Sequence, residues 1–189
     1  MHLNTSTFPK FVDTLNHRFR ENGLGYEFNI DALQIIRVDN QAIHQSAIQP
    51  ALQVLAAREY THANAELIAA FNDYKKGDYP DCLVKCCSAM ESVLKVIIKR
   101  ERWGGNEVDK ETAGPLIARF RNQTGLDSFF EQPLILIANL RNKISPAHGA
   151  GDKPKIVPQH FAHYALNATT SAILLLDDHA KYAKSAAGP

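Results

Sequence analysis

Hydrophobic residues between about positions 58 and 182 recur at the three- and four-residue spacing of helices that bury one face. The pattern predicts helices over about 58–76, 80–101, 115–122, 133–145 and 158–182. In the second helix, the residues expected to form the core stripe are Leu83, Cys86, Cys87, Met90, Val93, Leu94 and Ile97. In the last helix, the residues expected to face inward are Phe161, Ala165, Ala168, Ala172, Leu175 and Tyr182. Short connections favour antiparallel neighbours, so this region predicts a helical bundle.

The first 57 residues follow a different pattern. A helix is expected over about 8–22, with Phe11, Leu15 and Phe19 at four-residue spacing. Strand-like composition over 26–30 and 33–38 predicts a short β-hairpin, and a short helix is expected after Pro50. The predicted fold class is therefore mainly α: an N-terminal extension (1–57) of unassigned function with a helix and a β-hairpin, a bundle (58–184) and a flexible tail (185–189).

Composition narrows the class of protein. The 189 residues are 45% hydrophobic and 22% charged, which is ordinary for a soluble globular chain. No apolar run approaches the ~20 residues that span a membrane, and the N-terminus lacks the apolar core of a signal peptide, so a cytoplasmic protein is expected. The net charge of +1 means that any RNA contact depends on local basic residues.

No metal site or cofactor is predicted. Cys82, Cys86 and Cys87 share one expected helix, but their spacing is not typical of zinc sites and favours buried free thiols. His160 and His163 lie one helical turn apart, and two histidines alone do not make a convincing zinc site.

Arg141 occupies a position where the pattern calls for a hydrophobic residue. It shares a stripe with Leu134, Ile137 and Ile144. Burying an unpaired charge is costly, so Arg141 is expected to have a partner or a functional task. Pro146 disfavours helix just before it, which places His148 past the helix end, in a segment suited to a functional site.

Two further patterns qualify this interpretation. The Arg-x6-His spacing alone is weak, because Arg37 and His44 repeat it in the hairpin region. Glu91 and Lys95 flank the core stripe of the second helix, where we expect them to be half-buried. Glu followed by Lys at this spacing is commonly a stabilising ion pair worth about 0.2–0.5 kcal/mol, so a structural role is an alternative for these two residues.

Together, E-S-V-L-K and the later L-R-N-K-I-S-P-A-H-G resemble the HEPN superfamily, most closely the prokaryotic abortive-infection proteins, over about residues 58–182. Many HEPN proteins are metal-independent endoribonucleases. The resemblance implies catalytic roles for Arg141, Asn142 and His148, assistance from Glu91, and a homodimer whose two motifs share a cleft. The basic residues expected to contact RNA are Lys95 and Lys143. Relatives silenced by nucleotidyl transfer carry a Tyr where this chain has Ala150, so that regulation is not expected.

The chemistry of these residue types fits RNA cleavage by attack of the 2′-OH. Histidine has an ordinary pKa near ~6.5 and serves as acid or base at neutral pH. An Arg fork binds phosphate oxygens and stabilises developing charge without a metal. The first hypothesis is thus an endoribonuclease acting in abortive infection, phage defence or as a toxin, with an antitoxin or other regulatory partner. The alternatives are a non-catalytic HEPN module that binds RNA, a nucleotide or a protein, and a helical interaction domain with a structural Arg141–Glu91 pair.

Overall fold

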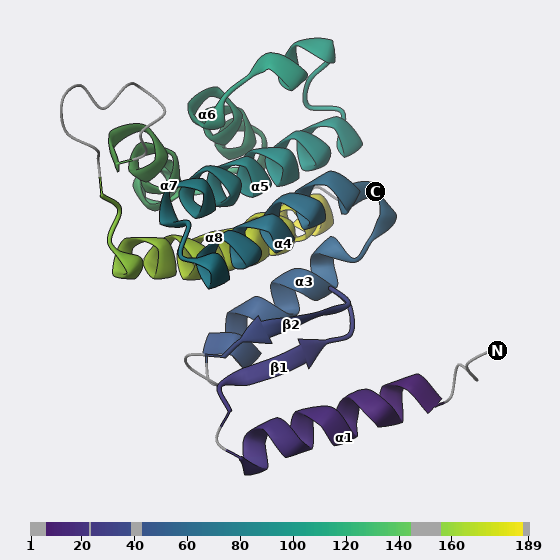
Figure 1. The fold of residues 1–189 in the computed structure, drawn as a ribbon. Coiled ribbons are helices and arrows are strands. Elements are labelled where there is room, and N and C mark those ends of the chain that lie inside the picture. Colours follow the sequence, from purple (N-terminus) through teal and green to yellow (C-terminus); the bar gives the residue numbers. More distant parts are fainter. Residues whose placement is uncertain (1–6, 23, 39–42, 145–155, 187–189) are drawn as a thin grey trace.

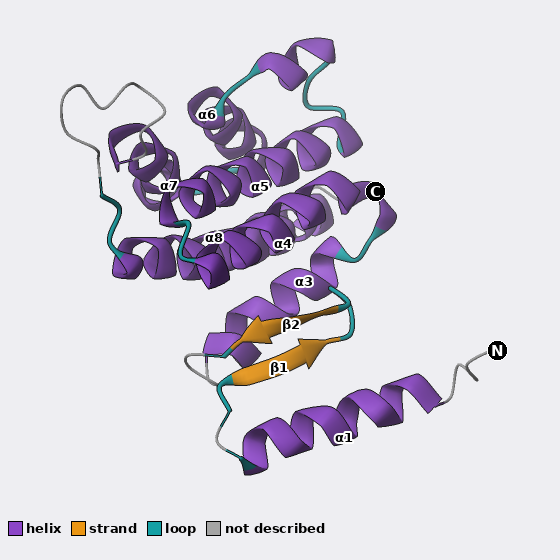
Figure 2. Cartoon of the chain, in the orientation of Figure 1, coloured by secondary structure: helices purple, strands orange, loops and turns teal. Residues whose placement is uncertain are grey.

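The computed structural model describes residues 7–22, 24–38, 43–144 and 156–186, and Figure 1 shows their arrangement. In these residues helices predominate and a single two-stranded sheet occurs near the N-terminus (Figure 2). The predicted fold class, mainly α with an N-terminal helix and β-hairpin, is confirmed.

The N-terminal part contains α1 (Thr7–Glu21), β1 (Tyr26–Asn29), β2 (Gln34–Arg37), a π-helix (His44–Ile48) and α3 (Gln49–Leu55). The two strands are antiparallel, with Tyr26 opposite Arg37 and Asn29 opposite Gln34. The π-helix and α3 pack against the long C-terminal helix, so this part is joined to the bundle through them. The short helix expected after Pro50 therefore begins earlier in the chain.

The bundle is built from five α-helices with short 3-10 segments before or between them. The helices are α4 (Thr61–Lys76), α5 (Tyr79–Arg100), α6 (Ala113–Thr124), α7 (Glu131–Ile144) and α8 (Gln159–Ala186). The 3-10 segments are Arg58–Tyr60, Asn106–Lys110 and Ser128–Phe130. The turn between α4 and α5 follows from its sequence: Gly77 adopts a φ of 81°, and the Asp78 side chain caps α5 by accepting from the Asp81 N–H.

Helix α5 lies at the centre of the bundle and contacts α4, α6, α7 and α8. Every residue of its predicted core stripe is buried, from Leu83 to Ile97. A helix surrounded on most sides needs a wide apolar face, which the three cysteines extend. They are buried free thiols, as expected.

The buried faces of α1 and α8 depart in part from the hydrophobic pattern of the sequence. In α1 the buried positions are Val12 and Asn16, while Phe11 is 62% exposed. In α8 the prediction is confirmed for Ala165 and Ala172, which are buried, and is wrong for Tyr182, which is 67% exposed; Phe161, Ala168 and Leu175 are half-buried. The buried residues beside this stripe include Ala162, Leu166, Thr169, Ile173, Leu176 and Ala180. The reason in α8 is that the helix packs against several partners, including α5, α3 and the π-helix, so residues adjacent to the predicted stripe are covered.

Asn16 explains the face that α1 buries. Its side-chain amide donates to the Phe28 carbonyl at 3.0 Å and accepts from the Phe28 N–H at 2.7 Å. This pair of bonds imitates a neighbouring strand along the outer edge of β1, and the only contact that α1 makes extensively within the described residues is with β1.

Candidate active site

Arg141 lies near the C-terminal end of α7, on the stripe that packs against α5. Leu134 and Ile137, which precede it on this stripe, are each 2% exposed. The Arg141 side chain is 24% exposed, so it lies at the edge of the core. Helix α7 therefore holds a permanent cation at the boundary between the core and the surface.

The partner of Arg141 is Glu91 on α5. Arg141 Nη1 lies 3.5 Å from Glu91 Oε1, and the Glu91 side chain is 13% exposed. The same oxygen accepts the Ala113 N–H at 3.0 Å and lies 3.6 Å from Cys87 Sγ. Because Ala113 is the first residue of α6, a helix N-terminus also favours the carboxylate. Glu91 thus connects α5, α6 and α7.

Asn142 lies beside this ion pair on the exposed surface. Its Oδ1 accepts a hydrogen bond from Arg141 Nε at 3.2 Å. The guanidinium is therefore fixed from two sides, by Asn142 through Nε and by Glu91 through Nη1. The structure brings together three of the predicted site residues: Arg141, Asn142 and Glu91.

The remaining predicted site residues stand apart from this group or outside the described structure. Lys95 is half-buried, as expected, but its Nζ donates to the Asp109 carbonyl at 3.1 Å. The ion pair that helical spacing suggested between Glu91 and Lys95 is not formed, because Glu91 turns toward α6 and α7. His148 and the side chain of Lys143 lie outside the described residues.

Cys87 borders the site but is not suited to act as a nucleophile. Burial, together with the Glu91 charge, raises the pKa of the thiol to about 12. The thiol therefore stays protonated at neutral pH. Among the described residues, no group of three or more His, Cys, Asp or Glu side chains is placed to hold a metal ion. His163 packs its ring on Tyr74, with the ring centroids 6.0 Å apart.

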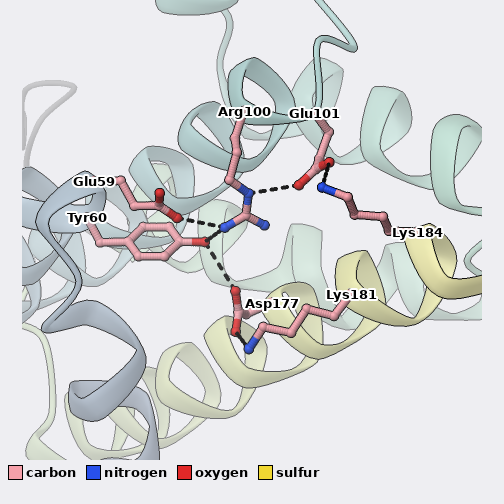
Figure 3. A network of polar contacts seen from close by, with 7 residues as sticks. All are labelled: Glu59, Tyr60, Arg100, Glu101, Asp177, Lys181 and Lys184. Carbon is pink, nitrogen blue, oxygen red and sulfur yellow. Dashed lines mark hydrogen bonds and ion pairs between the residues drawn. The ribbon is translucent and has the colours of Figure 1, made fainter. Parts of the chain in front are cut away.

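A second polar cluster, which the sequence analysis missed, joins the end of α5, the C-terminal part of α8 and the 3-10 segment Arg58–Tyr60 (Figure 3). Tyr60 donates to Asp177 at 3.2 Å and accepts from Arg100 at 3.2 Å. Arg100 also contacts Glu59 at 2.7 Å and Glu101 at 2.8 Å. The lysines of α8 complete the cluster: Lys181 pairs with Asp177 and Lys184 with Glu101.

This second cluster has the character of a structural network. Asp177 is 2% exposed and both of its oxygens are engaged, so the buried charge is compensated. The signal in the sequence was an Asp four residues after the buried Ile173. The Arg141 side chain is also partly exposed, which leaves it accessible to a phosphate.

Comparison with known protein families identifies the part of the chain that contains this site. Residues 61–180 match the family model Abi_C, described as a HEPN-like domain. No curated protein matches the chain, and no solved structure does. Among the described residues, no helix is both long enough and apolar enough to cross a membrane. The matched region covers the whole bundle from α4 to most of α8, and the chain belongs to the Abi_C family of HEPN-like domains.

Proposed function

We propose that this protein is a metal-independent endoribonuclease of the HEPN type, acting in abortive infection, phage defence or as a toxin. The observation that carries the proposal is the pairing of Arg141 with Glu91 and Asn142 inside the region that matches the HEPN-like family model. The Arg141 guanidinium is oriented by Glu91 and Asn142 while 24% of the side chain stays exposed. The exposed part of the side chain is accessible to an incoming phosphate, whose oxygens a guanidinium binds through its N–H donors.

In the proposed reaction, the 2′-oxygen of the RNA attacks the adjacent phosphorus and the P–O5′ bond breaks. A His148 imidazole removes the proton of the 2′-OH, and an imidazolium donates a proton to the leaving 5′-oxygen. Arg141 binds the phosphate oxygens and stabilises the charge that grows on them. Glu91 orients Arg141, and Asn142 holds a phosphate or ribose oxygen. The products are a 2′,3′-cyclic phosphate and a 5′-OH.

A homodimer would supply two imidazoles to one cleft, one as base and one as acid. An exposed apolar surface of the bundle supports this part of the proposal. Phe129, Leu136 and Tyr164 are 75%, 39% and 50% exposed and line one shallow hollow formed by the start of α7 and by α8. Exposed apolar residues gathered in one place are typical of a protein interface. Lys95 and Lys143 are proposed to contact the RNA backbone.

The test is a cleavage assay in the presence of EDTA, with cellular RNA and mapping of the product ends. Wild type is compared with His148→Ala and with His160→Ala, a control that removes an exposed histidine from α8. We expect wild type and the control to leave 2′,3′-cyclic phosphates, and His148→Ala to lose about 100-fold or more of the rate. Full cleavage by His148→Ala would refute the assignment.

A non-catalytic HEPN module is the second candidate. The pairing of Arg141 with Glu91 supports it, because the guanidinium already has a stable partner without RNA. This function predicts RNA affinity that falls steeply with salt and no turnover by folded wild-type protein. The same preparations used in the cleavage assay would distinguish the two functions.

A further inference from the structure

One side of the N-terminal part is apolar and uncovered. Figure 1 shows α1 at the edge of the molecule, on the far side of the hairpin from the bundle. Val12 and Asn16 are the positions that α1 buries against β1. The remainder of its apolar stripe is exposed or half-buried: Phe8, Phe11, Leu15 and Phe19. The fold therefore uses only part of the apolar arc of an amphipathic helix, and the rest of this arc faces solvent.

The hairpin continues this surface on one of its two faces. Side chains alternate along a strand, so Glu27 and Ile36, which are opposite each other in the register, lie on the same face. Ile36 is buried and Glu27 accepts a hydrogen bond from Gln49 at 2.8 Å, so this face is directed toward α3. Phe28 and Ile35, the next pair in the register, lie on the other face, where Phe28 is half-buried and Ile35 is exposed. The hairpin thus directs a second set of apolar side chains away from α3.

A ring contact joins the helix to the hairpin. Phe8 packs edge-on against Phe28, with the ring centroids 6.1 Å apart and an angle of 87° between the ring planes. Tyr26 lies two residues before Phe28, on the same face of β1, and is exposed. We call this surface the N-terminal face, and its residues are Phe8, Phe11, Leu15, Phe19, Tyr26, Phe28 and Ile35.

The N-terminal face is large enough for a protein interface. Phe8, Phe11 and Tyr26 are 38%, 62% and 38% exposed. With about 200 Å² for each aromatic side chain, these three rings alone expose roughly 280 Å². A standard interface buries about 800 Å² of each partner, of which about 450 Å² is apolar. The three rings supply more than half of that apolar area and the other four side chains add to it, so the face suffices for one partner of a dimer.

The charge of this region indicates the kind of partner. Over residues 7–38 the basic residues are Lys10, Arg18, Arg20 and Arg37, and the acidic residues are Asp13, Glu21, Glu27 and Asp31. Four residues of each sign give a formal net charge of zero. Nucleic acids and anionic lipid surfaces attract regions with an excess of positive charge, so the balance disfavours both as partners. An interface between identical copies brings the same charges together, which is tolerated when neither sign is in excess.

We propose that the N-terminal face binds the same face of a second copy of this chain around a two-fold axis, with Phe11 as the main apolar anchor. Aromatic side chains in the middle of an interface commonly contribute most of its binding energy. The face lies outside residues 61–180, the region that matches the family model, and is distinct from the hollow formed by α7 and α8. The inference therefore does not depend on the proposed nuclease activity. If the bundle also dimerises, two different two-fold contacts on each chain join four chains.

The first test is light scattering of the full chain after size-exclusion chromatography, over a range of concentrations. Phe11→Glu places a charge on the N-terminal face, and Tyr182→Glu is the matched control, because Tyr182 is an aromatic residue of similar exposure on α8. Phe129→Glu tests the hollow on the bundle. We expect Phe11→Glu to halve the mass of the wild-type assembly and Tyr182→Glu to leave it unchanged. Combining Phe11→Glu with Phe129→Glu should give the mass of one chain, 21.0 kDa.

The masses also separate this inference from the homodimer of the proposed nuclease. A mass that Phe129→Glu halves and Phe11→Glu leaves unchanged overturns the inference and retains the bundle dimer. A mass that Phe11→Glu halves and Phe129→Glu leaves unchanged supports the inference and rejects the bundle dimer. A wild-type mass of 21.0 kDa at every concentration overturns both.

Cross-linking tests which side of α1 makes the contact. The three native cysteines are buried, so a cysteine introduced on α1 is the accessible thiol of the chain. Leu15→Cys lies on the N-terminal face, and His17→Cys, on the opposite side of the same helix, is the control. A bis-maleimide reagent should link Leu15→Cys into covalent dimers at least about tenfold faster, because pairing raises the effective concentration of the two thiols. Equal rates for the two variants would overturn the proposal. So would binding of wild type to phosphatidylcholine vesicles that Phe11→Glu abolishes, since a lipid surface would then cover the face.

Discussion

Replacing Arg141 with Ala separates a functional arginine from a structural one. At 3.5 Å and an effective dielectric constant near ~20, the gross attraction between Arg141 and Glu91 is about 5 kcal/mol. Most of this is offset, because the two side chains are 24% and 13% exposed and recover hydration when they are separated. In the variant, Glu91 also keeps the hydrogen bond that it accepts from the Ala113 N–H. We expect the free energy of unfolding to fall by about 1 kcal/mol. This is the upper end of the range for a surface ion pair and well below the loss when a buried ion pair is broken.

This loss is measured by urea denaturation followed by far-UV circular dichroism. A double-mutant cycle with Glu91→Gln should return a coupling of about 1 kcal/mol. In a chain of this size the Arg141→Ala change corresponds to a fall of about 2–4 °C in melting temperature. RNA cleavage by the same variant should fall about 100-fold or more, because Arg141 is proposed to stabilise the transition state.

Arg119→Ala is the matched control. Arg119 forms an ion pair with Glu111, and the exposed fractions of the two side chains, 29% and 18%, resemble those of Arg141 and Glu91. This variant should lower the melting temperature and leave cleavage unchanged. A loss above about 3 kcal/mol in Arg141→Ala, with cleavage retained, would refute the functional reasoning and leave the structural ion pair as the explanation.

Three further predictions concern the fold. Tyr60→Phe removes the hydroxyl between Asp177 and Arg100 and should cost about 2 kcal/mol in urea denaturation, whereas Tyr182→Phe, at an exposed site, should change stability by less than about 0.5 kcal/mol. Asn16→Ala should increase hydrogen exchange and proteolysis in α1 and leave the protection of α5 unchanged; equal protection of α1 in both proteins would contradict the strand-like role of Asn16. Stability should fall between pH 9 and about pH 12, because the unfolded chain ionises Cys87 near its ordinary pKa of 9.0 while burial keeps the folded thiol protonated up to about 12. Burial raises the pKa of Tyr60 as well and acts in the same direction, so flat stability in that window would contradict both shifts.

The parts of the fold that could be predicted are those fixed by local pattern. The core stripe of α5 was correct because one helix is buried nearly all round, so small errors of phase do not matter. The stripe of α8 was correct only in part, because the buried arc of this helix depends on partners far away in the chain, the π-helix and α3 among them. The docking of α1 through Asn16 could not be predicted, because nothing in the local pattern places the Phe28 backbone opposite this side chain.

The candidate site, too, could be predicted from the local pattern only in part, because long-range packing decides the rest. The misplaced charge at Arg141 was visible in the pattern, and the need for a partner followed from electrostatics alone. The identity of that partner as Glu91 was compatible with the sequence, but so was a pair between Glu91 and Lys95. The packing of α6 and α7 on α5 decides between them, since it brings Ala113 and Arg141 to the same carboxylate oxygen.

The two Arg-x6-His spacings show the difference between what spacing predicts and what packing decides. Arg37–His44 and Arg141–His148 are equivalent as patterns, yet spacing reports only which residue types occur and how far apart they lie along the chain. Whether a histidine is desolvated depends on long-range packing, and His44 becomes fully buried because the π-helix that it begins lies against α8.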